Sequence, residues 1–392
     1  MNCDFGVELL GMKFKNPIWL GASDATNKWN INRAIDSGAG AVVLKSVSEL
    51  RDFQKPGITR FLVHDENGQS RVSDEYTFFS RGGPLQSVDE ISEQLPHWIE
   101  HAKRMNVRVV GSVNAGTLEG WGDLSFKLQQ KGVDALELNF GNPHARHSKN
   151  AMGAKISQST DRAEQIVRIV TQATSLPVIV KLSPHAPDLI ALAQAVRKAG
   201  AAGVTMMHRF QGLMIDLETQ RPALGGYNGI GGTWMTPLSL YWVSQIYAQI
   251  GGPVIGGNGV HSWQSAVEFM LAGAHSVQLS SSVMMHGYGR VADILNGLQN
   301  YCDKQGVTRL SDLVGKSAQC LREEDTVEFP PRRAALTDAS VCLACEVKPC
   351  RDSCFFGALS LKGGVPDINE QCNGCGLCAV HCPFNGALTF VE

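Results

Sequence analysis

Pro177-Val-Ile-Val-Lys-Leu-Ser183 is a short, almost continuous apolar run that ends in a lysine and a serine. The next segment, Asp188-Leu-Ile-Ala-Leu-Ala-Gln-Ala-Val-Arg-Lys-Ala199, has apolar residues at helical spacing and is followed by Gly200. A second apolar run, Gly203-Val-Thr-Met-Met-His-Arg209, comes directly afterwards. A strand, a helix and a second strand in this order, with nearly continuous apolar strands, are typical of a parallel sheet covered by helices.

The same alternation runs from residue 16 to about residue 306. Eight such strands fit a closed (β/α)8 barrel, so we predict an α/β fold with a TIM barrel over residues 1–306. An open, doubly wound sheet is the alternative, but it normally has a glycine-rich phosphate turn after its first strand. Here that turn reads Gly21-Ala-Ser-Asp-Ala-Thr26, which favours the barrel. The predicted strands are 17–22, 41–46, 108–114, 135–141, 177–183, 203–209, 253–259 and 276–282.

Cysteine is concentrated near the C-terminal end, where eight of the 11 cysteines follow Val341. They form two runs, Cys342-x2-Cys345-x4-Cys350-x3-Cys354 and Cys372-x2-Cys375-x2-Cys378-x3-Cys382. Crowding of this kind in a large chain indicates a metal site rather than a disulfide framework. Close triples of cysteine suit an iron–sulfur cubane, whereas zinc ribbons, the alternative, use separated pairs. We therefore predict a linker over 307–335 and a small iron–sulfur domain over 336–392.

The composition is that of a soluble globular protein, with 43% hydrophobic residues, 18% charged residues and a formal net charge of −2. Because there is no basic surplus, we expect no nucleic acid partner. No apolar run reaches the ~18 residues of a membrane span, and the first residues lack the features of a signal peptide. We therefore expect a cytoplasmic protein without a membrane partner.

Polar residues at the ends of the predicted strands mark the place where barrels carry their chemistry. A lysine at the end of an apolar strand is costly to bury without an anionic or electron-rich partner. Gly256-Gly-Asn-Gly259 and the serines after the last strand would bind a phosphate, although the glycine run alone could be a plain turn. With iron–sulfur clusters nearby, this set indicates FMN, which exchanges one electron with clusters and two with a substrate. The polar residues are Ser23, Lys45, Ser46, Asn114, Asn139, Lys181, His208, Arg209, Gly257, Asn258, Gly259, Ser280 and Ser281.

Several segments of the chain are similar to the dihydroorotate dehydrogenase superfamily, and most of all to the pyrimidine-reducing domain and ferredoxin module of dihydropyrimidine dehydrogenase. They are Asn16-Pro-Ile-Trp-Leu-Gly-Ala-Ser23, Val43-Leu-Lys-Ser46, Ala135-Leu-Glu-Leu-Asn139, Val180-Lys-Leu-Ser-Pro184, Gly231-Gly232 and Val277-Gln-Leu-Ser-Ser281. The resemblance implies an isoalloxazine ring beside Ala22, Ser23, Lys45, Asn114, Asn139 and Lys181. It also implies a ribityl phosphate along Gly231, Gly232, Gly257, Gly259, Ser280 and Ser281. Ser46 and Asn258 complete the predicted cofactor set.

The C-terminal run, about residues 336–392, resembles a bacterial two-cluster ferredoxin of the α+β class. The resemblance implies one 4Fe–4S cluster on Cys342, Cys345, Cys350 and Cys382. It implies a second 4Fe–4S cluster on Cys372, Cys375, Cys378 and Cys354. Two features depart from the ferredoxin pattern: the four-residue gap before Cys350, and Phe355 in place of the usual proline.

The barrel also departs from the superfamily pattern at the loop after the fourth strand. The superfamily has Asn-Leu-Ser-Cys-Pro-His there, with the cysteine moving a proton, whereas this chain has Asn139-Phe-Gly-Asn-Pro-His144. Asn142 takes the place of the cysteine, and an amide does not titrate near neutral pH. Ser80 stands roughly where the superfamily has a substrate-binding asparagine, and His208-Arg209 replaces its Asn-Thr. We expect a substrate other than uracil or thymine, with an activated C=C or C=N bond.

Other residues must then move the proton and bind the substrate. His208 and His144 are candidates for the proton, because histidine titrates near pH 7. Arg209, Arg146 and Arg81 could bind a carboxylate or phosphate of the substrate, although solvent exposure alone would explain each of them. Long loops over 47–86, 142–158 and 210–235 are predicted to act as lids, since loops of this length are uncommon without a function.

The electron partner is expected to be a separate NAD(P)H-flavoprotein subunit or a ferredoxin, because the chain has no dinucleotide fingerprint. A homodimer is possible. Two alternatives have the same cofactors: a dihydropyrimidine dehydrogenase catalytic subunit with a different proton donor, and an electron-transfer flavoprotein subunit without its own substrate.

Overall fold

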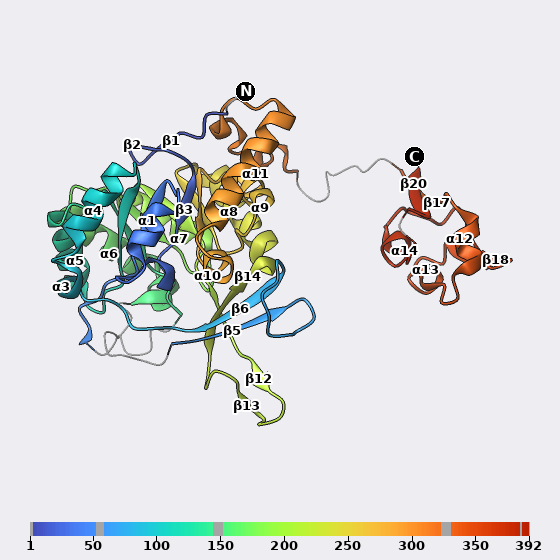
Figure 1. Cartoon of the computed structure of the whole chain (residues 1–392), viewed down its shortest axis with the longest axis horizontal. Coiled ribbons are helices and arrows are strands. Elements are labelled where there is room, and N and C mark those ends of the chain that lie inside the picture. Colours follow the sequence, from blue (N-terminus) through green and yellow to red (C-terminus); the bar gives the residue numbers. More distant parts are fainter. Residues whose placement is uncertain (1–2, 52–58, 144–151, 323–330, 385, 392) are drawn as a thin grey trace. The chain divides into compact units, whose positions relative to one another are not determined.

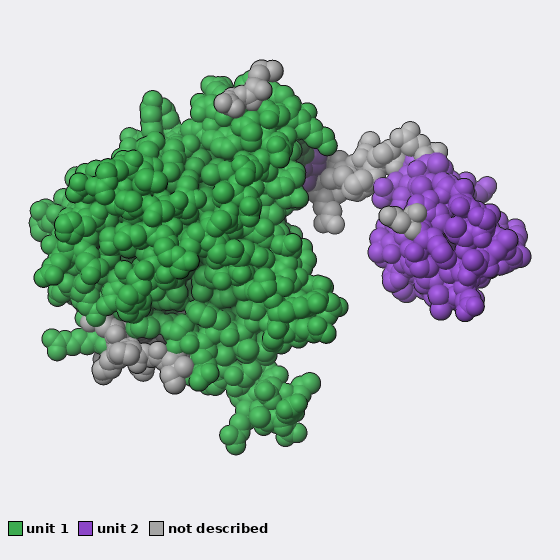
Figure 2. Space-filling view, viewed as in Figure 1, with its two compact units in different colours: residues 1–321 green, residues 322–392 purple. Residues whose placement is uncertain are grey.

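The computed structural model describes residues 3–51, 59–143, 152–322, 331–384 and 386–391. The chain divides into two compact units, Met1–Leu321 and Arg322–Glu392 (Figure 2). The division falls inside the predicted linker, because the short turns Leu310–Leu313 (η4) and Ala318–Cys320 (η5) belong to the first unit.

The first unit is built around a closed barrel of eight parallel strands, which confirms the predicted TIM barrel and its eight strands (Figure 1). Each strand pairs with the next along the chain, and the last closes the ring by pairing with the first, with Val277 opposite Ile18. The strands are β3 (Ile18–Leu20), β4 (Ala41–Val43), β7 (Arg108–Val113), β8 (Ala135–Asn139), β9 (Val178–Lys181), β10 (Gly203–Met206), β15 (Val254–Gly257) and β16 (Ser276–Leu279).

Two buried clusters divide the barrel into an interior and an outer layer. The interior cluster contains Trp19 and residues of β4, β7, β8, β9 and β15, and Phe14 of the N-terminal hairpin stacks on Trp19 with ring centroids 4.8 Å apart. This hairpin consists of β1 (Val7–Leu9) and β2 (Met12–Phe14). The intervening residues, such as Ile18 and Leu20, belong to the outer cluster together with the helices. This alternation is the inward and outward pattern of a filled barrel.

Helices cover the outside of the barrel (Figure 1). The predicted helix over 188–199 is present as α7 (Leu189–Lys198). Asp188 caps it by accepting a hydrogen bond from Ala191 N at 2.9 Å, and Gly200 follows with a φ of +110°. The other helices of the layer are α1 (Ile31–Asp36), α3 (Val88–Ile91), α4 (Leu95–Arg104), α5 (Leu118–Gln130), α6 (Thr160–Ala173), α8 (Thr236–Ile250), α9 (Trp263–Ala272), α10 (Ser281–His286) and α11 (Arg290–Gln305).

The segments 47–86 and 210–235, predicted as long loops, contain a four-stranded antiparallel sheet, which we call the lid sheet. Its order is β11 (Phe210–Gly212), β14 (Asn228–Gly232), β6 (Tyr76–Arg81) and β5 (Arg60–Asp65). The loop prediction was wrong here, because the two segments satisfy their backbone hydrogen bonds by pairing with each other. A small hairpin of β12 (Ile215–Asp216) and β13 (Arg221–Pro222) extends from the lid sheet (Figure 1). In the third predicted lid, residues 144–151 lie outside the described residues, and Gly153–Gln158 form a 3-10 turn.

The described residues of the second unit form two small antiparallel sheets and three short helices. One sheet pairs β17 (Arg333–Leu336) with β20 (Leu388–Val391), and the other pairs β18 (Leu359–Lys362) with β19 (Val365–Ile368). The helices are α12 (Ala339–Ala344), α13 (Pro349–Asp352) and α14 (Leu377–Val380). In the parts of the chain that the structure describes, no helix has the length and apolar character needed to cross a membrane.

Candidate functional site

A large pocket lies where the barrel strands end, between them and the lid sheet. It encloses about 2060 Å³, including its open mouth. The carboxyl ends of the strands are where TIM barrels bind their ligands. The strand ends and the turns after them contribute Ala22, Ser23, Asp24, Lys45, Ser46, Asn139, Lys181, Met207, Gly257 and Gln278, and the lid sheet contributes Phe78, Ser80, Arg81 and Gly231.

The pocket brings together most of the residues that the sequence predicts for a cofactor site. All of them line it except Asn114, which is buried at the end of β7, and Gly232, which follows Gly231 in β14. Of the predicted catalytic residues, Asn142, His208 and Arg209 also line it. His144 and Arg146 lie outside the described residues.

A buried charged network forms the floor of the pocket. Lys181 Nζ donates a hydrogen bond to Gln278 Oε1 at 2.6 Å and lies 3.5 Å from Glu137 Oε1. The other carboxylate oxygen of Glu137 accepts hydrogen bonds from Gln278 Nε2 at 2.6 Å and Thr205 Oγ1 at 2.9 Å. The sequence analysis did not single out Glu137 or Gln278. The available signal was one carboxylate within an otherwise apolar strand, since Glu137 is fully buried.

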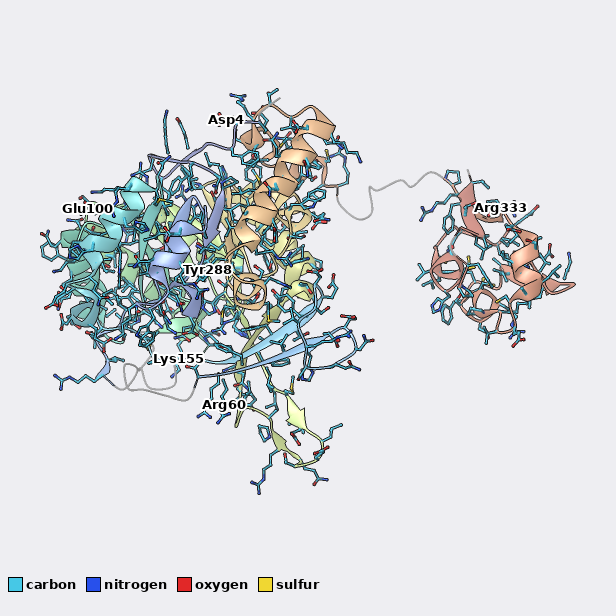
Figure 3. The ribbon with its side chains drawn as sticks, viewed as in Figure 1. Asp4, Arg60, Glu100, Lys155, Tyr288 and Arg333 are labelled. Carbon is cyan, nitrogen blue, oxygen red and sulfur yellow. The ribbon has the colours of Figure 1, made fainter. Side chains whose placement is uncertain are left out.

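A second ion pair joins Asp24 and Lys45 at the wall of the pocket. Asp24 begins a short 3-10 turn, Asp24–Thr26 (η1), which Ser23 caps by accepting a hydrogen bond from Ala25 N at 3.3 Å. Tyr288, labelled in Figure 3, fixes the same turn by donating a hydrogen bond to Ala25 O at 2.6 Å. The turn therefore holds the Asp24 carboxylate at the pocket, although the sequence analysis did not single it out.

Arg209 connects the end of β10 to the lid sheet. Its Nη1 donates a hydrogen bond to Ser80 Oγ of β6 at 2.6 Å. Burial lowers the pKa of Arg209, and the nearby carboxylate of Asp24 opposes this effect. An arginine guanidinium stays protonated in proteins, so Arg209 is a fixed positive charge under the lid sheet.

The side-chain amide of Asn114 can form hydrogen bonds with a further polar group at this end of the barrel. Asn114 is fully buried, and neither its Nδ2 nor its Oδ1 has a hydrogen-bond partner among the described residues. Nearby, Asn139 Nδ2 donates to Ser46 Oγ at 3.2 Å, and Ser46 Oγ lies 2.8 Å from Ser112 Oγ. Buried polar atoms are normally paired, so unpaired amide atoms beside a pocket suit a ligand with its own donors and acceptors.

Glycine and short polar residues line the pocket after the last two strands. This glycine wall consists of Gly257, Asn258, Gly259, Ser280 and Ser281. Gly259 has a φ of +125°, and a Cβ there would lie 2.7 Å from Thr236 N, so the backbone conformation and the packing of the protein both require glycine at this position. Because the residues of the wall have short side chains or none, a ligand in the pocket meets little steric hindrance along it.

Residues 5–301 match the sequence profile of the family described as dihydroorotate dehydrogenase. The chain belongs to the dihydroorotate dehydrogenase family. It is similar to the protein named dihydroorotate dehydrogenase B (NAD(+)), catalytic subunit, of Pyrococcus abyssi, with 31% identity over 317 residues that cover 79% of this chain and 97% of the relative. The proteins of the same name from Methanocaldococcus jannaschii and Thermoplasma acidophilum are 29% and 28% identical and cover 80% of this chain and 98% of each relative.

Dihydroorotate dehydrogenases are flavin-dependent oxidoreductases that use FMN and act on CH–CH bonds. The residues of this family member fit such a cofactor on three observations: the unpaired amide of Asn114, two lysines at strand ends, and the glycine wall. Membership of the family indicates FMN as the cofactor, and the residues that line the pocket are compatible with its ring and its phosphate.

The cysteine-rich part of this dihydroorotate dehydrogenase family member lies beyond the family match. A small pocket of about 350 Å³ in the second unit is lined by Cys354, Cys372, Cys375 and Cys378. Burial raises the pKa of the Cys342 thiol, and the nearby sulfurs of Cys382 and Cys345 raise it further.

Cys350 lies near Cys342 and Cys382. Burial raises its pKa most, and Cys382 and Cys342 add to the rise. Four of the cysteines thus line the small pocket, and Cys342 lies near Cys345, Cys350 and Cys382. Among the described residues, no three His, Cys, Asp or Glu side chains are arranged to bind one metal ion.

The hydrogen-bonded network at the pocket floor predicts that removal of Lys181 alone destabilises the protein more than removal of both Lys181 and the charge of Glu137. We expect Lys181→Met to lower the free energy of unfolding by about 3–5 kcal/mol, because it leaves the buried Glu137 carboxylate without its cation. The double variant Glu137→Gln/Lys181→Met should be more stable than Lys181→Met alone. Urea denaturation of the full chain measures both. Lys362→Met, in an exposed pair with Asp367, is the control, with an expected change of about 1 kcal/mol or less. A Lys181→Met effect as small as the control would contradict the network's importance.

Proposed function

We propose that this chain is the catalytic subunit of an FMN- and iron–sulfur-dependent oxidoreductase. It reduces or oxidises an activated C=C or C=N bond of a small cyclic or carboxylated substrate that is not uracil or thymine. The observation that carries this proposal is the composition of the pocket: it is lined by the residues predicted for the cofactor, by four cations, and by an amide, Asn142, where a thiol would move a proton.

The charges of the pocket support a carboxylated substrate. Among the lining residues, Asp24 alone carries a carboxylate, whereas Lys45, Lys181, Arg81 and Arg209 are cations. Lys45 pairs with Asp24, and Glu137 partly neutralises Lys181 from below. Arg81 and Arg209 therefore leave an excess of positive charge beside the lid sheet. Guanidinium groups suit carboxylates, because their planar fork donates two parallel hydrogen bonds.

The cofactor would lie with its ring beside Lys45, Asn139, Lys181 and Asn114 and its phosphate at the glycine wall. When bound, FMN supplies hydride chemistry and single-electron exchange in the same site. The residues of this chain hold it, exclude water beneath the lid sheet and orient the substrate against it. This assignment depends on the family membership and on the residues that line the pocket.

His208 is the residue that we propose to move the proton. It lies at the pocket, two residues before the lid strand β11, and its backbone N–H donates to Leu182 O at 3.0 Å. Its side chain packs so closely on Gly141 that a Cβ at Gly141 would overlap it. Histidine titrates near neutral pH and an amide does not, so His208 is better suited to this step than Asn142. His144 remains a proposed alternative.

The second unit would hold two 4Fe–4S clusters that relay single electrons. One set of ligands is Cys342, Cys345, Cys350 and Cys382, and the other is Cys354, Cys372, Cys375 and Cys378. The gathering of the cysteines into these groups supports the proposal. The external partner would be a separate NAD(P)H-flavoprotein subunit or a ferredoxin, since the relatives are named as catalytic subunits of an NAD(+) enzyme. The protein would act in the cytoplasm, as a homodimer.

Two pyrimidine reactions are the competing functions. Dihydroorotate oxidation is favoured by the names of the relatives, whose whole length the chain nearly covers. Dihydropyrimidine chemistry with another proton donor is favoured by the cysteine-rich unit after the barrel. An electron-transfer subunit without its own substrate is less consistent with the cations that line the pocket.

Cysteine variants test the cluster assignment. We expect Cys375→Ser to lose roughly half of the protein-bound iron, because it removes one ligand from one of the two clusters. Cys320→Ser is the matched control, since Cys320 is exposed and belongs to neither group. Iron and acid-labile sulfide in the anaerobically purified full chain are measured together with visible absorbance. Equal iron in both variants, or colourless wild-type protein, would contradict the assignment.

Substrate-dependent reoxidation of the reduced flavin tests the proposed reaction. We expect uracil and thymine to leave the reduced wild-type protein unchanged, because Asn142, Ser80 and His208-Arg209 replace the thiol and the residues that would read these pyrimidines. Asn142→Cys should also gain no turnover of uracil or thymine. The measurement is flavin absorbance after anaerobic mixing, with a cyclic or enoate carboxylate series as the positive arm. Fast reoxidation of the wild type by uracil or thymine would overturn the proposal in favour of a dihydropyrimidine enzyme, whereas fast reoxidation by orotate would identify orotate as the carboxylated substrate.

A further inference from the structure

Tyr76 contacts Ser281, a residue of the glycine wall. It is the first residue of the lid strand β6, and its side chain is only 3% exposed. Its hydroxyl lies 3.1 Å from Ser281 Oγ. Ser281 lines the pocket, whereas Tyr76 does not. Tyr76 therefore acts on any ligand of this wall through Ser281.

The backbone of Tyr76 is held against the neighbouring strand of the lid sheet. Its N–H donates a hydrogen bond to Thr233 Oγ1 at 3.1 Å, and Thr233 Oγ1 donates to Glu75 Oε2 at 2.9 Å. Gly232, with a φ of +133°, packs so closely on Tyr76 O that a Cβ there would overlap it. The position of the hydroxyl thus follows from the sheet rather than from a flexible loop.

The hydrogen-bond direction between the two hydroxyls matters for a phosphate. Burial raises the pKa of Tyr76 to about 12, so its hydroxyl keeps its proton at neutral pH. If Tyr76 donates to Ser281 Oγ, the single proton of Ser281 is left to donate elsewhere. An anion in the pocket accepts hydrogen bonds and donates none, so this direction suits an anion at Ser281.

An ion pair lies behind the wall. Arg290 pairs with Asp74 at 2.7 Å and lies close enough to Tyr76 for its charge to act on the phenol. His286 lies beside Tyr76, with ring centroids 6.3 Å apart, and burial lowers the pKa of His286. Because Asp74 neutralises Arg290, the feature that favours an anion at Ser281 is the hydroxyl hydrogen bond rather than a net positive charge.

We propose that Tyr76 is a positioning residue for the phosphate of the cofactor: it fixes Ser281 and directs the serine proton into the pocket. This inference depends on the proposed FMN site. It also gives the lid strand β6 two anchors, because Ser80 of the same strand accepts a hydrogen bond from Arg209 at 2.6 Å. One strand then joins the phosphate end of the pocket to its substrate end.

The test compares FMN with riboflavin, which has the same ring and lacks the phosphate. Flavin-free full-length protein is titrated with each ligand, and binding is read from flavin fluorescence rather than from turnover. We expect Tyr76→Phe to weaken FMN binding about tenfold, because a hydrogen bond that supports a charged group is lost, and to leave riboflavin binding unchanged. Ser281→Ala should do the same, and the double variant should bind FMN no more weakly than Ser281→Ala.

Tyr241→Phe is the matched control, since Tyr241 is an exposed tyrosine of α8, and it should leave both affinities unchanged. A loss of affinity for both flavins in Tyr76→Phe would assign Tyr76 a purely structural role and overturn the inference. Unchanged FMN affinity in both Tyr76→Phe and Ser281→Ala would also overturn it and leave the proposed function standing. Failure of the wild type to bind FMN would remove the proposed function and this inference together.

Discussion

The buried carboxylate of Glu137 is the constraint on which the site depends. It is fully removed from water inside the barrel, and its partners come from three other strands: Lys181 of β9, Thr205 of β10 and Gln278 of β16. A charge at such a position is tolerated only when it is paired and hydrogen-bonded. Closure of the barrel brings these partners together, and their pairing in turn holds the lysine at the floor of the pocket. The floor is thus charged and fixed before any ligand binds.

The lid sheet forms the wall of the pocket that faces the ends of the barrel strands. Two segments far apart in the sequence pair at Phe78 and Gly231. The sheet is tied to the barrel by Arg209 at one end of β6 and by Ser281 near the other. A wall built as a sheet has its backbone hydrogen bonds satisfied, so it can present side chains at defined positions beneath which water is excluded. Arg81 and Arg209 lie beside the lid sheet, whereas the glycine wall carries no charge, and this difference underlies the proposed division of the pocket into a substrate end and a phosphate end.

Much of this architecture could be predicted from the sequence. The apolar runs with intervening helical spacing gave all eight strands, and strand ends meet at one face of a barrel, so the polar residues after them were predicted to lie together. The lid sheet could not be predicted in this way, because the pairing of Tyr76–Arg81 with Asn228–Gly232 depends on long-range contacts that local periodicity does not contain. Glu137, Gln278 and Asp24 were missed for a related reason: their importance comes from partners on distant strands or turns. The spacing of the cysteines indicated a metal site, whereas their assignment to two clusters came from the resemblance to a two-cluster ferredoxin and stays a prediction.

The most direct test of the account is the identity and amount of flavin released from the purified full-length chain. Heat release followed by chromatography separates FMN from riboflavin and FAD and measures the amount per chain. The account predicts FMN, close to one per chain when the flavin-free protein is first saturated and then freed of excess ligand. Protein that retains no flavin after saturation, or that retains FAD in preference to FMN, would contradict it.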